Sequence, residues 1–215
     1  MTTPSLPPIS SLPTADEETI KFALNTLFEP SPDIHAIAIP VIRQRNRILA
    51  NPGLTAELPG PSSPLSSPTV PDDTPFTSYV SLIQHIGGLL HQLAISSSSP
   101  LSSPPAREKL HGILGSHPRL GTKKVDSAQS RAEQAQLNTG ATDEVERLAA
   151  LNRKYEERFP GLRYVVFVNG RSRDVIMEDM RRRIDRGDIR AEEREGLEAM
   201  VDIALDRARN LDSSS

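Results

Sequence analysis

A histidine in a glycine-bounded segment is the first residue of this chain whose type and setting suit chemistry. The segment Gly115-Ser-His-Pro-Arg-Leu-Gly121 contains the only histidine that is followed by proline. Pro118 restricts the backbone of His117 to an extended conformation, and the two glycines allow a tight path on either side. Because histidine titrates near neutral pH, His117 suits a proton donor or acceptor. A loop histidine that makes only a structural hydrogen bond fits the same sequence equally well.

A second candidate is the run Ser130-Arg131-Ala132-Glu133-Gln134, which follows shortly after. Ser-x-x-Glu is a helix capping box, and capping alone explains Ser130 and Glu133 without catalysis. A glutamate beside a histidine, however, raises the pKa of that histidine and fixes its orientation. A hydroxyl, a carboxylate and an amide on adjacent turns could also read the donors and acceptors of a ligand.

Arg207 is the third candidate, because it lies among apolar residues. Ala204, Ala208 and Leu211 surround it at helical spacing. A cation at the edge of an inward face needs an anionic partner. That partner is either an internal Asp or Glu, which is the usual case, or a substrate carboxylate held by a bidentate guanidinium.

The elements that must position these residues are helices. Thr77 and Ser172 are suited to N-cap positions, and Gly115 and Gly187 are suited to helix ends. Asp143 and Glu144 would lie in the first turn of the helix from 143 to 159. The apolar stripes are Ile20, Leu24, Leu27 and Phe28; Tyr79, Val80, Ile83, Ile86, Leu90 and Leu93; Leu110, Ile113 and Leu114 after Pro104 and Pro105; Leu148, Leu151, Tyr155 and Phe159; Ile176, Met180 and Ile184; and Leu197, Met200, Val201, Ala204, Ala208 and Leu211. We therefore expect an all-α fold, a single-domain helical bundle.

One segment departs from the helical pattern. Tyr164-Val165-Val166-Phe167-Val168 is a β-branched and aromatic run between Gly161 and Asn169-Gly170. It is too short and isolated to form a sheet of its own. We expect an extended stretch packed among helices, whose backbone polar groups need partners. A bound ligand is one way to supply them.

Proline and serine gather in three stretches that cannot build a core. We expect residues 1–13 to be a disordered tail, 51–75 a long mobile surface insertion and 96–104 a shorter one. They interrupt one domain, from 14 to 212, and do not divide it. Long Pro/Ser-rich surface loops are thus part of the expected fold.

Composition excludes several classes of function. The 215 residues include no cysteine, which excludes disulfides, thiolate zinc sites and cysteine nucleophiles. The five histidines lack ligand spacing, so we expect no metal site. A net charge of -3 does not indicate nucleic acid or a membrane surface as a partner. Acidic residues surround the basic run Arg181-Arg-Arg183 with Arg186, which favours a solvated helix face.

The chain also shows no targeting or membrane signal. No apolar run is long enough to span a bilayer, and the first residues lack the pattern of a signal peptide. The last residues, Asp212-Ser-Ser-Ser, are not a peroxisomal Ser-Lys-Leu address. We expect a cytoplasmic protein, with peroxisomal import on a partner left open.

Taken in order, the motifs resemble those of the 2-oxo-4-hydroxy-4-carboxy-5-ureidoimidazoline (OHCU) decarboxylase family. The motifs that carry the resemblance are His117-Pro-Arg-Leu-Gly, Ser130-x-x-Glu-Gln134, Leu151-Asn-x-x-Tyr155, Phe159-Pro-Gly-Leu-Arg-Tyr164 and Ile203-x-x-x-Arg207. The resemblance is good from about 106 to 211. From 16 to 95, only the helix ending in Leu27-Phe-Glu-Pro and the helix from Phe76 to Leu93 are similar.

This resemblance implies an activity and a set of site residues. It implies an all-α fold, often dimeric, that converts OHCU, a late intermediate of urate oxidation, to (S)-allantoin and carbon dioxide without a cofactor. His117 and Glu133 would be the catalytic pair. The substrate-binding residues would be Pro118, Ser130, Arg131, Ala132, Glu133, Gln134, Tyr164, Val165, Val166, Phe167, Val168 and Arg207. The implied partner is a small-molecule substrate, with a homodimer as a further possibility.

Two departures from the family pattern leave alternatives open. Pro160 looks inserted, Leu162 replaces an aromatic residue and Tyr164 replaces Phe, which could shift the extended segment. The long insertion at 51–75 also replaces a short, regular region. One alternative is therefore a paralogue acting on a related ureido or imidazole acid. The other is a helical interaction module whose Pro/Ser loop binds partners.

Overall fold

The computed structural model describes residues 5–50, 76–98, 104–121, 130 and 142–212, and within these ranges it contains helices and no strand. The expected all-α fold is confirmed. None of the helices in these ranges is long and apolar enough to cross a membrane. The insertion predicted at 51–75 lies outside the described residues.

The N-terminal part of the chain forms a short 3-10 helix, η1 (Ile9–Thr14), followed by α1 (Glu17–Phe28) and α2 (Pro32–Ala50). Asp16 caps α1 by accepting a hydrogen bond from the Thr19 backbone N–H at 2.8 Å. The predicted stripe of α1 is buried in the core. Residues 1–13 were predicted to be a disordered tail, but the second half of this range is packed against the fold. Leu12 is buried, and the Tyr79 hydroxyl donates to the Pro7 carbonyl at 2.6 Å.

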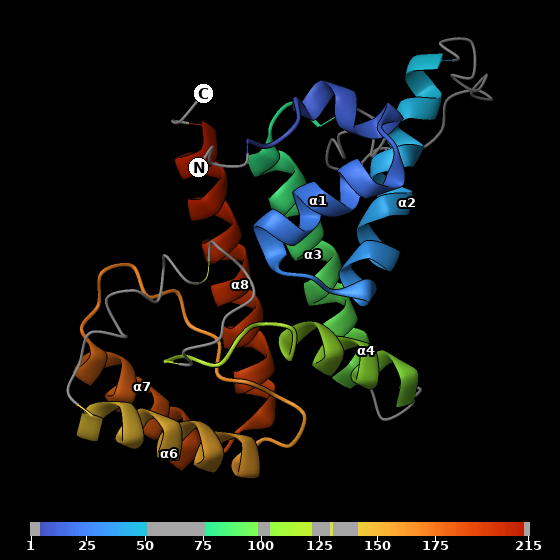
Figure 1. Cartoon of the computed structure of the whole chain (residues 1–215). Helices are drawn as coiled ribbons and strands as arrows, with labels where there is room; N and C mark the ends of the chain where they lie inside the picture. The colour runs from blue at the N-terminus through green and yellow to red at the C-terminus, as the bar shows by residue number, and fades with distance from the viewer. Residues whose placement is uncertain (1–4, 51–75, 99–103, 122–129, 131–141, 213–215) are drawn as a thin grey trace, which may run out of the picture.

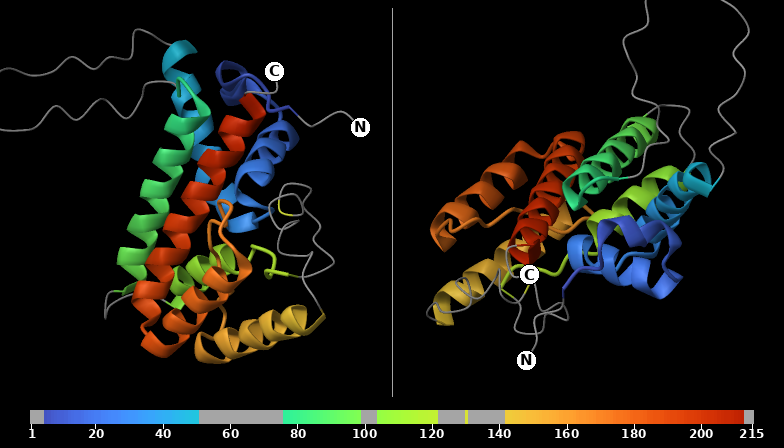
Figure 2. Two further views of the ribbon diagram at one scale, coloured as in Figure 1. Left: turned by 90° about the vertical axis from the view of Figure 1, so that its left-hand side faces the viewer. Right: turned by 90° about the horizontal axis from the view of Figure 1, so that it is seen from above.

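Two long helices, α3 (Tyr79–Ser98) and α8 (Ile189–Asp212), run side by side through the molecule (Figure 1, Figure 2). Their close approach depends on Gly87, where a Cβ would lie 2.9 Å from Cγ2 of Val201. At Gly88 a Cβ would meet nothing within 4 Å. Gly87 therefore marks a point of close contact between the two helices.

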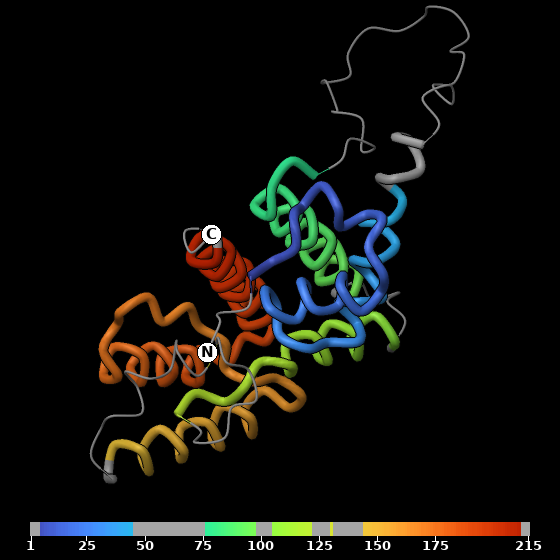
Figure 3. The backbone as a smooth tube through the Cα atoms, turned by 45° about the horizontal axis from the view of Figure 1, so that its top comes forward, coloured from blue at the N-terminus to red at the C-terminus, as the bar shows by residue number. Residues whose placement is uncertain are grey.

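The remaining helices, α4 (Pro104–Leu114), α6 (Thr142–Arg158) and α7 (Arg173–Arg186), complete the fold. In Figure 3, α8 lies between the group formed by α1 to α3 and the side-by-side pair α6 and α7. Ser172 caps α7, and Gly187 ends it in the left-handed conformation, as predicted. Two irregular segments, 115–121 after α4 and 159–172 between α6 and α7, pass alongside α8 and carry the predicted site.

Three local predictions are corrected. The cap of α3 is Ser78 rather than Thr77, because Ser78 Oγ accepts from the Ser81 backbone N–H at 3.1 Å. Residues 96–98 continue α3 and Pro104 begins α4, so both ends of the stretch predicted as a shorter Pro/Ser loop are helical, and 99–103 lie outside the described residues. α2 was not predicted, since Pro32 and Pro40 disguise a helix whose Ile34, Ala38 and Ile42 are buried.

Candidate active site

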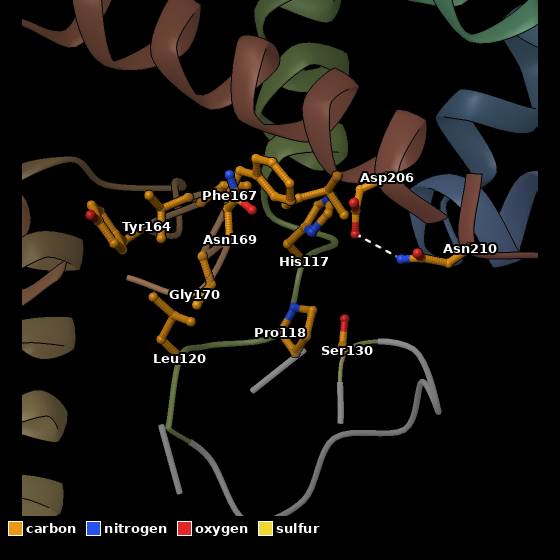
Figure 4. Close-up of a pocket in the computed structure, with 14 residues that line it drawn as sticks. His117, Pro118, Leu120, Ser130, Tyr164, Phe167, Asn169, Gly170, Asp206 and Asn210 are labelled. Carbon is orange, nitrogen blue, oxygen red and sulfur yellow. Dashed lines mark hydrogen bonds between the residues drawn. The ribbon is translucent and has the colours of Figure 1, made fainter. Parts of the chain in front are cut away.

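A pocket of about 400 Å³ lies where the two irregular segments meet α8. Segment 115–121 contributes His117, Pro118 and Leu120, while α8 contributes Ile203, Asp206 and Asn210. The rest of the described lining is Ser130 and the stretch from Tyr164 to Gly170. Figure 4 shows these side chains arranged around His117. The structure thus brings together residues that the sequence analysis placed at one site, from distant parts of the chain.

The backbone of segment 115–121 is held by α4, by α6 and by the segment that follows α6. Gly115 N–H donates to the His111 carbonyl at 2.8 Å and closes α4. Asn152 Nδ2 donates to the Leu120 carbonyl at 3.0 Å, and Arg163 Nη1 donates to the His117 carbonyl at 3.0 Å. These bonds restrain the backbone of the segment, and the restrained backbone limits the orientations that the His117 side chain can take.

The His117 side chain is buried, with 5% of the residue exposed. Its Nε2 has no hydrogen-bond partner within the described structure. Burial, together with the nearby Arg207 cation, lowers the pKa of His117 from 6.5 to about 4, while the Glu29 carboxylate acts in the opposite direction. The imidazole is therefore neutral at pH 7, and His117 is one of the residues that line the pocket.

Ser130 belongs to a buried polar cluster together with Glu29 and Arg207. Its Oγ donates to Glu29 Oε1 at 2.5 Å and accepts from Arg207 Nη2 at 2.9 Å. Arg207 Nη2 also donates to Glu29 Oε1 at 2.7 Å. The three side chains join the end of α1, the end of α8 and the pocket wall, and all are almost completely buried.

The stretch from Tyr164 to Val168, predicted to be extended and packed among helices, lines the pocket as a segment that is neither helix nor strand, and arginines hold three of its carbonyls. Arg183 Nη1 donates to the Val165 carbonyl at 3.2 Å, and Arg171 bonds the carbonyls of Phe167 and Val168. Every hydrogen bond to the backbone of 164–168 in the described structure uses a carbonyl as acceptor. The protein, rather than a ligand, therefore satisfies these carbonyls.

Comparison with known proteins assigns the chain to a family. The family described as OHCU decarboxylase matches residues 13–209. The chain belongs to the OHCU decarboxylase family. The matched range includes both pocket segments and Arg207.

Two curated relatives carry names from urate breakdown. An OHCU decarboxylase of Haloferax volcanii is 34% identical over 82 residues, which are 37% of this chain and 48% of that protein. A uric acid degradation bifunctional protein of a Bacillus species is 31% identical over 101 residues, which are 46% of this chain and 20% of that protein. The matches thus span at most about half the length of these relatives. No solved structure matches the chain significantly.

In this member of the OHCU decarboxylase family, the structure decides between the two anionic partners that the sequence allowed for Arg207. The sequence left open an internal carboxylate or a substrate carboxylate as its partner, and the structure supplies the internal one, Glu29. Arg207 Nη1 is engaged as well, at 3.3 Å from each of the Thr26 and Leu27 carbonyls. Arg207 is not among the described residues that line the pocket, whereas its neighbour Asp206 is.

A second correction concerns the basic run at 181–186. Arg183 is not solvated but buried, with Nε 2.8 Å from Glu192 Oε1 and its guanidinium 4.7 Å from the centre of the Tyr164 ring. Tyr155 also donates to Glu192, at 2.5 Å. The basic run therefore contains one buried arginine, Arg183, which holds the pocket segment through the Val165 carbonyl, whereas Arg181, Arg182 and Arg186 are exposed.

Sequence reasoning missed Glu29, Asp206 and Asn210. Asn210 Nδ2 donates to Asp206 Oδ2 at 3.0 Å, and both side chains line the pocket (Figure 4). A signal existed for Asp206, which lies three residues after Ile203 and therefore near the same helix face. Glu29 stood within the quoted Leu27-Phe-Glu-Pro motif, but only the fold shows that it meets residues about 100 and 178 positions away.

Several predicted site residues lie outside the described residues. They are Arg131, Ala132, Gln134 and the proposed catalytic Glu133. Their roles stay predictions, as do the catalytic role of His117 and the substrate-binding roles of the pocket residues. Within the described residues, no group of three His, Asp or Glu side chains is placed to hold a metal ion.

Proposed function

We propose that this protein decarboxylates OHCU to (S)-allantoin in the pocket beside His117. The observation that carries the proposal is a buried, neutral imidazole with an unpartnered Nε2, facing a cavity of about 400 Å³. Membership of the OHCU decarboxylase family and the names of the curated relatives support it.

The substrate's own structure explains why no cofactor is needed. Its carboxylate is attached to a hydroxyl-bearing ring carbon beside a ring C=N bond. When the bond to the carboxylate breaks, its electron pair forms a carbon–carbon double bond, and the C=N pair moves to the nitrogen, which takes up a proton. The product of this step is an enol, and carbon dioxide leaves.

The remaining step is a proton transfer that suits a neutral histidine. The enol hydroxyl gives up its proton and becomes a carbonyl, while the neighbouring ring carbon gains a proton on one face. His117 can accept the hydroxyl proton because its pKa of about 4 leaves the imidazole neutral at pH 7. Positioning and proton transfer of this kind contribute several orders of magnitude in rate.

The other proposed site residues hold the substrate in place. Ser130 and the stretch from Tyr164 to Val168 supply polar groups and shape, and Pro118 adds an apolar contact. We propose Glu133 as the partner that orients His117, on the resemblance alone. Asp206 is a pocket carboxylate and suits the N–H donors of a ureido group.

Release of carbon dioxide tests the proposal directly. OHCU is generated from urate labelled with ¹³C at the carbon that becomes its carboxylate, and ¹³CO₂ is followed with and without the protein. The proposal predicts release at a rate proportional to protein concentration and well above the spontaneous rate. An unchanged rate of release would show that the pocket serves another reaction.

Pro160, on which the alternative of a different substrate mainly rested, lies away from the described pocket. Pro160 is exposed in a turn in which Gly161 has a φ of +88°, and neither residue lines the described pocket. Phe159 and Leu162, on either side of that turn, are both buried. The stretch from Tyr164 to Gly170 lines the pocket after this turn, which supports the proposed site.

A further inference from the structure

The backbone of Glu29 has a conformation that glutamate rarely adopts. Glu29 follows the last residue of α1, with φ of 71° and ψ of 156°. This region is essentially restricted to glycine and costs a side-chain-bearing residue on the order of 1–3 kcal/mol. Such strain persists only where surrounding contacts enforce it, and it concentrates at functional sites.

The contacts that enforce this conformation converge on the Glu29 carboxylate. Oε1 accepts from Ser130 Oγ at 2.5 Å and from Arg207 Nη2 at 2.7 Å, and both Glu29 and Arg207 are 3% exposed. The Glu29 backbone N–H donates to the Asn25 carbonyl at 3.1 Å. The end of α1 is thus fastened to α8 and to the pocket wall through one side chain.

The same bonds occupy the terminal nitrogens of Arg207. A guanidinium has four N–H bonds on its two terminal nitrogens. Four acceptors lie within 3.3 Å of these nitrogens: the carbonyls of Thr26 and Leu27 for Nη1, and Glu29 Oε1 and Ser130 Oγ for Nη2. A bidentate fork to a substrate carboxylate would require some of these bonds to break.

We infer that Glu29 and Arg207 form a positioning pair that holds Ser130 in the pocket wall, and that Arg207 acts on the substrate through Ser130 rather than by direct contact. The inference rests on the proposed function. It assigns a role to Glu29, which the sequence motifs did not single out. It also explains why the chain tolerates a strained glutamate at the end of α1.

The charges around His117 agree with this assignment. The Arg207 cation lowers the pKa of His117 and the Glu29 carboxylate raises it, so that Glu29 offsets part of the effect of Arg207. Asp206 also carries a carboxylate on the same pocket. Without Glu29, a buried cation would face the imidazole with less compensation.

A double-mutant cycle on kcat/KM tests whether Glu29 acts through Ser130. Glu29→Gln and Ser130→Ala are measured singly and together, at a pH where His117 is neutral and a temperature where every variant is folded. We expect Glu29→Gln alone to lower kcat/KM by about 10- to 100-fold, as misplaced groups do. In the Ser130→Ala background the same change should lower it less than about twofold. Additive effects, or no effect of Glu29→Gln alone, would overturn the inference.

Glu193→Gln is the matched control for loss of a buried carboxylate. Glu193 is 1% exposed and accepts from Arg190 at 3.0 Å, but it does not line the described pocket. This variant should lose stability and keep its kcat/KM. If Glu29→Gln does not fold, Glu29→Gln/Arg207→Gln leaves no unpaired buried charge and replaces it in the cycle.

A titration of His117 separates failure of this inference from failure of the proposed function. The imidazole is followed by NMR in ¹³C-histidine-labelled protein, without substrate, in wild type, Glu29→Gln and Glu193→Gln. We expect a lower His117 pKa in Glu29→Gln only. An unchanged pKa would overturn the placement of Glu29 beside the site, whether or not the wild-type protein turns over OHCU.

Discussion

His117 shows how burial sets the chemistry of a single residue. The glycine-bounded segment that carries it is fixed by Arg163 and Asn152, and the His117 residue is 5% exposed. Desolvation penalises the imidazolium, and the neutral ring that results is a proton acceptor across the physiological pH range. The sequence predicted a histidine poised for proton transfer, but the neutral state depends on burial that only the fold reveals.

Replacement of His117 tests its proposed catalytic role. Asparagine is smaller than histidine, but it retains a polar side chain in the pocket. We expect His117→Asn to lower kcat for OHCU decarboxylation by about 10²–10⁴-fold, since general acid–base catalysis contributes that much. Steady-state kinetics and thermal unfolding are measured together. Turnover near the wild-type level in a folded variant would remove His117 from the mechanism.

The same residue gives stability a predictable dependence on pH. The folded pKa of about 4 lies below the ordinary value of 6.5, so the unfolded chain binds more protons between these values. The free energy of unfolding should be unaffected above about pH 7.5 and should fall as the pH drops from about 6.5 to about 4. The difference between the two pKa values corresponds to about 3 kcal/mol.

Urea unfolding across this pH range checks the dependence. The decrease attributable to His117 is the part that disappears in His117→Asn, which has no imidazole to protonate. Parallel curves for the two proteins between pH 4 and 7 would show that His117 is not buried as the structure has it.

At the scale of elements, helices with an unbroken apolar stripe were predictable. The period of 3.6 residues is visible in α1, α3, α6, α7 and α8, and the predicted inward residues are mainly buried. α2 was not predictable, because Pro40 interrupts the apolar pattern of the sequence. In the structure the helix continues through Pro40, whose side chain faces solvent. Arg183 was mistaken for a surface residue, since a single inward arginine in a charged helix leaves no periodic signal.

The contact between α3 and α8 can be tested with two neighbouring glycines. A Cβ at Gly87 would lie 2.9 Å from a methyl group of Val201, whose short side chain cannot move away freely. Alanine at Gly88 meets nothing within 4 Å and should stabilise the helix by up to about 1 kcal/mol. We expect Gly87→Ala to be less stable than Gly88→Ala by about 1–3 kcal/mol, as for other overpacked sites.

Chemical denaturation measures the free energy of unfolding of both alanine variants. The two carry the same substitution in the same helix, so each serves as the control for the other. Equal stability would mean that α3 and α8 do not approach as closely as the structure shows.

At the scale of the whole molecule, the pocket depends on segments that are far apart in the sequence. The motifs predicted His117, Pro118, Ser130 and the stretch from Tyr164 to Val168, because each carries a local signature. They could not predict the bond between Glu29 and Arg207, which are 178 positions apart. Long-range pairing of charges follows from the packing of α1 against α8, and no local pattern encodes it.

Deletion of the Pro/Ser-rich insertion distinguishes an enzyme from an interaction module. Residues 52–74 fall between α2 and α3 in the sequence, and the motifs that carry the resemblance to the family all lie outside them. We expect the deletion variant to retain kcat/KM for OHCU within about twofold of the wild type. Loss of turnover in a folded deletion variant would show that the insertion contributes to the site.

The stereochemistry of the product tests the central claim most directly. Urate is freshly oxidised so that OHCU accumulates, the protein is added, and circular dichroism of the allantoin is recorded as it forms. Spontaneous decay gives racemic allantoin, so any optical activity reports protonation on one face in a chiral pocket. The account predicts the signal of (S)-allantoin with the wild-type protein and its near absence with His117→Asn. Racemic allantoin, formed at the rate seen in buffer, would contradict it.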